Sequence, residues 1–178
     1  MALGLQRGIV RLCPHDPAWE TLAEECISEL KELLGSCAPD IQHVGSTSVR
    51  SIRAKPILDI AVAVKELDDI FPFLPVLAEH GYIRRNYDNA GEVFLVCGVE
   101  EQRTHYIHVV PLDSPEWRNY LRFRDYLNRN EEAARRYEAR KLELSAEFPE
   151  DRASYTEGKA ELIRVLLDEA ERAERSGL

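Results

Sequence analysis

The sequence lacks three features that would assign a class of protein at once: paired cysteines, a long apolar run and an internal repeat. Its cysteines are widely spaced and form no C-x-x-C pair, which argues against a zinc knuckle or a redox motif. No apolar run is long enough to cross a bilayer, and the N-terminal segment lacks the apolar core of a signal peptide. We therefore expect a cytoplasmic protein that has no membrane partner and keeps its cysteines reduced.

Net positive charge is also absent. The 178 residues include 32 acidic and 23 basic ones, which gives a net charge of −9 at pH 7. An acidic protein repels phosphate backbones, so we expect no broad binding to DNA or RNA, although a local basic pocket for a small anion is compatible with this charge. Length and composition otherwise fit one ordinary globular domain, and they leave the oligomeric state open.

Two phosphate and nucleophile motifs are missing as well, because the sequence contains neither the Walker A pattern GxxxxGK[ST] nor the GxSxG nucleophile elbow. What is present is a small polar cluster, Gly45-Ser46-Thr47-Ser48, directly after an apolar run. A Gly-Ser turn between a strand and a helix can bind a phosphate through backbone N–H groups and hydroxyls. The alternatives are a helix N-cap, or a serine nucleophile, for which the spacing identifies no partner base.

A single acidic residue, Asp59, lies inside the apolar run from Ile57 to Val64. An ionised carboxylate is costly to bury unless it is paired or holds a metal. One interpretation is a structural salt bridge with Lys55 or an arginine. The other is a carboxylate at the rim of a sheet that faces a cleft, and the nearby Gly-Ser cluster favours this second interpretation.

The hydrophobic pattern predicts alternating strands and helices in the first half of the chain and mainly helices after Pro111. We expect an α+β (α/β) fold in which a mixed β-sheet is flanked by helices, within a single domain. Residues 1–112 would form the sheet-containing core, residues 113–173 the C-terminal helices and residues 174–178 a frayed tail. The expected strands are 7–12, 41–44, 57–64, 82–85, 92–97 and 104–110, and the expected helices are 17–34, 67–80, one that begins at Ser114-Pro115, and 151–174.

From His43 to Ile60 the sequence resembles the motif H-h-G-S-T-[AS]-V-P-G-h-x-A-K-P-I-h-D-I of the GrpB family, with Arg50-Ser51 in place of Pro-Gly. Further segments resemble other parts of the same family in the same order, so the resemblance covers nearly the whole chain. These segments are His15 to Trp19, Arg103 to Val110, Ser114 to Leu127 and Tyr155 to Ile163.

The resemblance implies a fold similar to that of the nucleotidyltransferase superfamily. In such enzymes a Gly-Ser turn grips the terminal phosphates of a nucleotide, and carboxylates on the next strand hold divalent metal, here Mg²⁺ or Mn²⁺. Asp59 corresponds to the first carboxylate, but the second position, two residues later, is Ala61. Because a two-metal site needs a replacement for the missing carboxylate, we consider Glu92 and His108 as further metal ligands.

The strand that carries His108 also departs from the family pattern H-H-L-H, since Tyr106 replaces one histidine. Tyr106 and His108 share a face of this strand, which makes Tyr106 a candidate for stacking on a base or sugar. The predicted catalytic residues are Asp59 and His108, and the predicted metal ligands are Asp59, Glu92 and His108. The predicted phosphate- or nucleotide-binding residues are Gly45, Ser46, Thr47, Lys55, Tyr106, Arg122, Arg124 and Lys159.

Three functions are compatible with these residues. The first is a metal-dependent nucleotidyltransferase whose cleft lies between the Ser46 turn, Asp59, His108 and the helix with Arg122 and Arg124. The second is a non-catalytic module that binds a nucleotide or another phosphorylated small molecule, which the missing second carboxylate favours. The third is a metal-dependent hydrolase or cyclase in the same cleft. For the two arginines, a solvated helix face or pairing with a neighbouring acid is the alternative interpretation, and for His108 it is a structural role.

Overall fold

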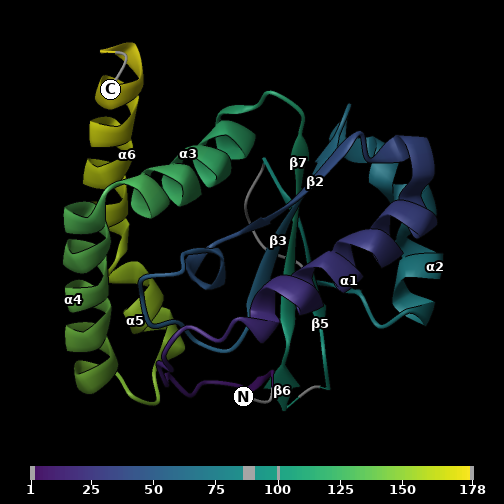
Figure 1. The fold of residues 1–178 in the computed structure, drawn as a ribbon. Coiled ribbons are helices and arrows are strands. Elements are labelled where there is room, and N and C mark those ends of the chain that lie inside the picture. The colour runs from purple at the N-terminus through teal and green to yellow at the C-terminus, as the bar shows by residue number, and fades with distance from the viewer. Residues whose placement is uncertain (1–2, 86–90, 100, 177–178) are drawn as a thin grey trace.

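A five-stranded mixed sheet forms the centre of the computed structural model, which describes residues 3–85, 91–99 and 101–176. The strand order is β2-β3-β7-β5-β4; β3 and β7 are parallel, and the other neighbours are antiparallel (Figure 1). The mixed α+β fold expected from the sequence is therefore confirmed. The strands are β2 (Asp40–Val44), β3 (Leu58–Val64), β7 (His105–Pro111), β5 (Val93–Cys97) and β4 (Ile83–Arg85).

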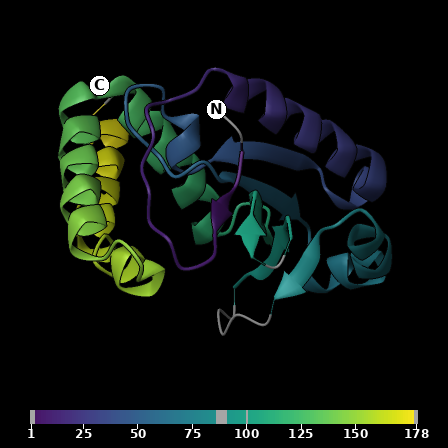
Figure 2. The ribbon, with the colours of Figure 1, turned by 90° about the horizontal axis from the view of Figure 1, so that it is seen from below.

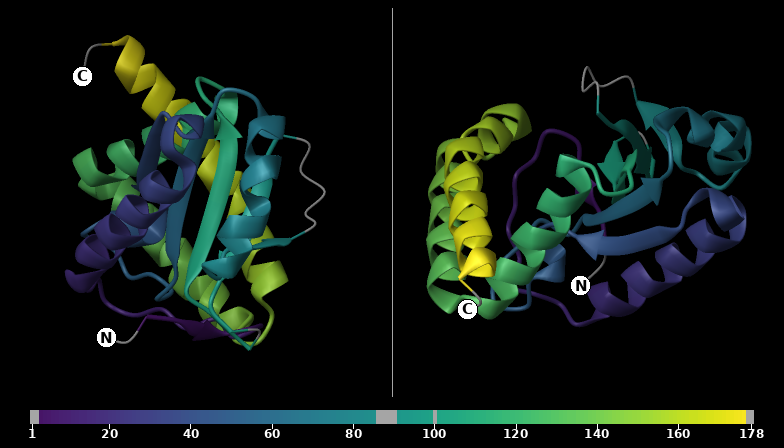
Figure 3. Two further views of the ribbon diagram at one scale, coloured as in Figure 1. Left: turned by 90° about the vertical axis from the view of Figure 1, so that its right-hand side faces the viewer. Right: turned by 90° about the horizontal axis from the view of Figure 1, so that it is seen from above.

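One face of the sheet is covered by α1 (Ala18–Leu34) and α2 (Leu74–Glu79), which lie in front of the strands in the left-hand view of Figure 3. Alternate residues of the strands point to this face and pack against Trp19 and Leu30 of α1 in the main hydrophobic core. Asp16 caps α1, since its carboxylate accepts a hydrogen bond of 3.0 Å from the Ala18 N–H. Two 3-10 helices flank these elements: η1 (Gly35–Cys37) and η3 (Leu67–Phe73).

On the opposite face of the sheet lies α3 (Pro115–Arg129). Ser114 begins α3 by accepting a hydrogen bond from the Trp117 N–H, as the sequence predicts. Trp117 then packs on a small cluster that includes Ala61 of β3 and Val110 of β7. The period of two along each strand brings Asp59 to this same face, because Asp59 and Ala61 are two residues apart.

The remaining helices form a layer beside the sheet: α4 (Glu131–Glu147), α5 (Arg152–Glu157) and α6 (Ala160–Arg175). Figure 2 shows α4 and α6 side by side, at the end of the molecule away from α2. They pack on the loop that follows β2, through Val49 and Ile52. None of the helices among the described residues has the length and apolar character needed to cross a bilayer.

Three predicted segments differ from the structure. The segment 7–12 is not a strand; β1 (Leu5–Gln6) precedes it and pairs with β6 (Gln102–Arg103), whereas the N–H of Val10 donates to the Pro149 carbonyl near the C-terminal helices. The helix predicted over 67–80 begins as the 3-10 helix η3, in which Pro72 supplies no N–H for a regular α-helix.

The third segment is the helix predicted over 151–174, which is divided at Gly158 and Lys159. A Cβ atom on Gly158 would approach the Leu144 side chain of α4 to 2.5 Å, so the chain turns where it passes closest to α4. The helix α6 continues to Arg175, so Glu174 and Arg175 are helical instead of frayed. Residues 177–178 of the predicted tail lie outside the described residues.

Candidate functional site

The Gly-Ser cluster and Asp59 are direct neighbours in the structure. In the antiparallel pair of β2 and β3, Val44 lies opposite Asp59, so the turn after β2 passes over the Asp59 side chain. Gly45 has φ 68° and ψ −167°, and a Cβ atom at this position would collide with the Asp59 carboxylate. Only glycine therefore fits here, because it tolerates the positive φ and leaves room for the carboxylate.

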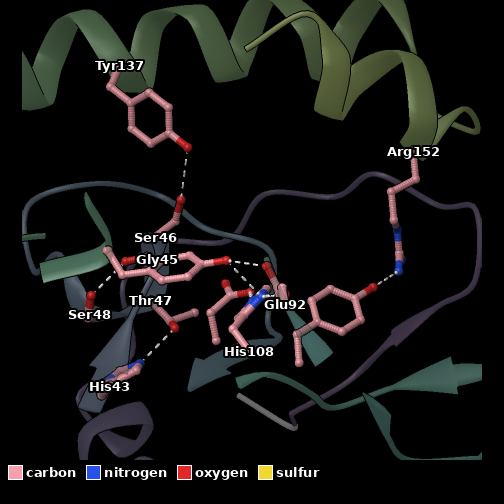
Figure 4. Close-up of polar contacts among 12 residues, drawn as sticks. His43, Gly45, Ser46, Thr47, Ser48, Glu92, His108, Tyr137 and Arg152 are labelled. Atoms are coloured by element: carbon pink, nitrogen blue, oxygen red, sulfur yellow. Dashed lines mark hydrogen bonds and ion pairs between the residues drawn. The ribbon is translucent and has the colours of Figure 1, made fainter. Parts of the chain in front are cut away.

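The three hydroxyl groups of the cluster have different partners (Figure 4). The Ser48 hydroxyl donates to the Gly45 carbonyl at 2.6 Å and stabilises the short 3-10 helix η2 (Ser46–Ser48). Thr47 is buried, and its oxygen lies 2.9 Å from Nε2 of His43. Ser46 has only a long contact of 3.5 Å to the Tyr137 hydroxyl of α4, which leaves it the most available hydroxyl of the three.

Asp59, His108 and Glu92, which come from three separate segments of the chain, form a connected polar group. Nε2 of His108 lies 3.2 Å from Oδ1 of Asp59, and Nδ1 lies 2.7 Å from Oε1 of Glu92. The Tyr120 hydroxyl of α3 donates to Oε2 of Glu92 at 3.1 Å and lies 3.0 Å from Nδ1 of His108. Burial alone would lower the pKa of His108, but hydrogen bonds and charge from the two carboxylates outweigh it and raise the pKa to about 9.

This arrangement does not fit a divalent metal site. A histidine binds a metal through the lone pair of a deprotonated nitrogen, whereas both nitrogens of His108 face carboxylate oxygens, which accept hydrogen bonds when they are ionised. The position of the second carboxylate holds Ala61, whose methyl group packs near Trp117. Within the described ranges, no group of three histidine, cysteine or acidic side chains is placed to hold a metal ion. The predicted residues are together, but as an ion-paired group.

Cationic side chains meet at the other side of the turn. The ammonium groups of Lys55 and Lys159 lie 5.1 and 4.7 Å from the centre of the Tyr155 ring. Lys141 of α4 lies 4.9 Å from the centre of the Tyr137 ring and donates a hydrogen bond to the Arg53 carbonyl.

Burial and mutual repulsion affect these lysines. Burial and, to a smaller extent, the charges of Lys159 and Arg152 together lower the pKa of Lys55 to about 7, against an opposing contribution from Asp59. Burial followed by the charge of Lys159 lowers the pKa of Lys141 to about 7 in the same way. Lys55 and Lys159 are therefore both close enough to Lys141 to influence its charge, and Lys159, Arg152 and Asp59 act on Lys55.

Tyr106 shares the face of His108, as predicted from the strand period. Its hydroxyl accepts a hydrogen bond of 2.8 Å from Nη1 of Arg152, and its ring lies 5.4 Å from the ring of Phe94. Arg152 also donates to the carbonyls of Gln6 and Ile9, so it connects α5 to the N-terminal segment and to the sheet.

Comparison with known proteins identifies the family of this chain. Residues 9–169 match the family described as "GrpB protein". The chain belongs to the GrpB family. The glutamate-rich protein GrpB of Alkalihalophilus pseudofirmus is 37% identical over 172 residues, which cover 94% of this chain and 99% of that protein. The crystal structure of the conserved protein GrpB from Enterococcus faecalis has a TM-score of 0.86 and 30% identity, and the match covers 92% of this chain and 99% of that chain.

A structure of the Cid1 poly(U) polymerase bound to MgATP also matches this GrpB chain, over 72% of it and 45% of the Cid1 chain. The TM-score is 0.47 and the identity 13%, which is too little likeness to support an argument about chemistry.

The structure does not bring Arg122 and Arg124 into the Asp59 group of this GrpB protein. Arg122 pairs with Glu174 of α6 at 2.9 Å and lines a separate cavity of about 310 Å³ between α3 and α6. Arg124 pairs with Asp125 and donates to the His43 carbonyl at 3.1 Å. Both arginines are thus committed to protein groups, which is the alternative left open by the sequence, and α3 contributes Tyr120 to the site instead.

Several residues of the site were not predicted from the sequence: Tyr120, Tyr137, Lys141 and Arg152. Lys141 carried one usable signal, because it lies four residues after Tyr137 and three before Leu144, on the inward face of α4. A fully buried lysine on an apolar helix face is uncommon and indicates a special environment.

Proposed function

We propose that this GrpB protein binds a phosphorylated small molecule of the nucleotide class, with the phosphate held by Lys55 and Lys159 next to the Gly45–Ser46 turn. The observation that carries the proposal is the meeting of these two ammonium groups at the Tyr155 ring. No hydrogen bond or ion pair joins either group to another residue in the part of the chain that the structure describes.

Electrostatics supports an anionic ligand at this place. Partly buried ammonium groups without an acceptor destabilise a protein, and here Lys141 and Arg152 add further positive charge nearby. The protein as a whole is acidic, with a net charge of −9, so the local excess of cations is not a general property of the chain. A phosphate group carries enough negative charge and enough acceptor oxygens to compensate two lysines.

The turn and Asp59 support a ligand with hydroxyl groups. Ser46 approaches Tyr137, and the ring of Tyr137 lies under Lys141, so the turn and the cations belong to one continuous region. Among the described residues, Oδ2 of Asp59 has no hydrogen-bond donor, and the side chain is 28% exposed. This oxygen could accept a hydrogen bond from a sugar hydroxyl while the lysines bind the phosphate.

The test is a series of thermal-shift measurements with ATP, GTP, CTP, UTP and inorganic phosphate in buffer with EDTA. At least one nucleotide should raise Tm, because a ligand at about 100 times its Kd stabilises by roughly 2.7 kcal/mol. The shift should be lost in Lys55→Met and Lys159→Met and kept in Lys65→Met, which alters an exposed lysine at the end of β3. Failure of all these compounds to stabilise the protein would refute the proposal.

Nucleotidyl transfer is a second candidate, because the Gly45 turn packs directly on Asp59 as the resemblance to nucleotidyltransferases implies. It requires the same bound nucleotide and, in addition, release of pyrophosphate when an acceptor is supplied. Pyrophosphate release that is lost in Asp59→Asn would support transfer. If the nucleotide binds but no pyrophosphate is released in the presence of candidate hydroxyl and amine acceptors, only the binding function is supported.

A further inference from the structure

The contacts of His108 have a consequence that does not depend on the proposed phosphate ligand. Its ring lies between two carboxylates, with Nε2 3.2 Å from Asp59 and Nδ1 2.7 Å from Glu92. The side chains of His108 and Glu92 are 15% and 9% exposed, so both are largely removed from water. A third partner, the Tyr120 hydroxyl, contacts both of them from α3.

The hydrogen-bond partners of His108 determine the protonation state of its ring. An ionised carboxylate can only accept, so each of the two nitrogens must carry a proton to bond to its carboxylate. The ring is then an imidazolium with one positive charge between two negative charges. The imidazolium compensates the negative charges of Asp59 and Glu92 and donates a hydrogen bond to each, as a bound cation would compensate them. The low exposure of the group strengthens each contact.

The neighbouring strand explains why a metal is not accommodated. In the parallel pair of β3 and β7, Ala61 lies opposite His108, so the ring stands beside the position where a second carboxylate would be. Mg²⁺ and Mn²⁺ prefer several oxygen ligands around one point. Both oxygens of Glu92 already accept hydrogen bonds, Oε1 from His108 and Oε2 from Tyr120, and turning this carboxylate towards a metal would leave those buried donors without an acceptor.

We infer that the ring of His108 is the resident cation of this site, so that the Asp59 group is complete without a divalent metal. His108 is then a positioning residue. It holds Oδ1 of Asp59 and leaves Oδ2 for a ligand, at the place where the family resemblance implies a metal-binding carboxylate.

The experiment measures binding of Mn²⁺ alone to the full chain by electron paramagnetic resonance of the free ion. Asp59→Asn should leave the amount of bound Mn²⁺ unchanged from the wild type, as should Asp168→Asn, which alters an exposed acid of α6. His108→Asp replaces the cation by a third carboxylate facing the other two. This variant should gain one Mn²⁺ site that is tighter by at least about tenfold, and the added change Asp59→Asn should remove it.

Two outcomes would overturn the inference. One is a stoichiometric Mn²⁺ site in the wild type that Asp59→Asn abolishes and Asp168→Asn leaves intact. The other is a folded His108→Asp protein, checked by circular dichroism, that gains no Mn²⁺ site. If His108→Asp does not fold, the comparison of the wild type with Asp59→Asn decides the question alone.

Discussion

Replacing Lys55 by methionine should make the unliganded protein more stable while it weakens ligand binding. The variant keeps an apolar stem of similar length and removes one ammonium group from a region that also holds Lys159 and Arg152. Methionine has no charge to desolvate and none to repel its neighbours. A gain in stability is unusual for a substitution at a partly buried site, so the direction of the change is informative.

The magnitude follows from the pKa of Lys55, which falls from 10.5 to about 7 in the folded protein. At about 1.4 kcal/mol per unit, the largest possible penalty at neutral pH is roughly 4 kcal/mol, and partial exposure to water reduces it to about 1–2 kcal/mol. Because the folded-state pKa is the lower one, the unfolded state binds more protons between about pH 7 and 10.5. The penalty is therefore full below pH 7 and is relieved as the pH rises through this range.

The assay is urea unfolding of the wild type, Lys55→Met and the exposed control Lys65→Met at several pH values. Lys55→Met should exceed the wild type by about 1–2 kcal/mol in free energy of unfolding near pH 7, and the gap should narrow towards pH 10. Lys65→Met should stay close to the wild type throughout. A destabilised Lys55→Met protein, or a gap that does not change with pH, would refute the reasoning about this lysine.

Three further predictions concern the turn and the ion-paired group. Gly45→Ala should destabilise by at least about 1 kcal/mol more than Gly35→Ala in urea unfolding, since both glycines have positive φ but only the first lies against Asp59; equal losses would contradict this. Glu92→Gln should lower the free energy of unfolding by roughly 2–3 kcal/mol, because the buried imidazolium of His108 then has only one negative partner; an unchanged free energy of unfolding would contradict the pairing. Burial lowers the pKa of His43 to about 4, so its contribution to stability should be lost as pH falls from about 6.5 towards 4. The Tm of the wild type should therefore fall more than that of His43→Gln over this pH range, and an equal fall in both proteins would contradict the prediction.

Local patterns in the sequence correctly predicted those features of the fold that are encoded by residues close to one another in sequence. The caps at Asp16 and Ser114 and the apolar runs of β2 and β3 are of this kind, and each is present in the structure. The period of two also predicted correctly that Tyr106 and His108 share a face. The strand prediction for residues 7–12 was wrong because this segment contacts residues near Pro149, which a local pattern cannot indicate.

The site was harder to predict because its chemistry depends on partners that are distant in sequence. The sequence identified Asp59, Glu92 and His108 as a possible group but not the arrangement in which the ring separates the two acids. A metal ligand set and an imidazolium pair use the same residue types, so only the geometry distinguishes them. The packing of α4 brings Tyr137 to Ser46 of the turn and places Lys141 over the Tyr137 ring, which no spacing near Gly45 could indicate.

A direct binding titration tests the central claim most sharply. Isothermal titration calorimetry with the nucleotide that gives the largest thermal shift, in excess EDTA, should show one site per chain in the wild type and in Lys65→Met. The same titration should show at least about tenfold weaker binding in Lys159→Met, where the phosphate would lose one of its two ammonium partners. Binding that requires added Mg²⁺, or that is unaffected by the loss of Lys159, would contradict the claim.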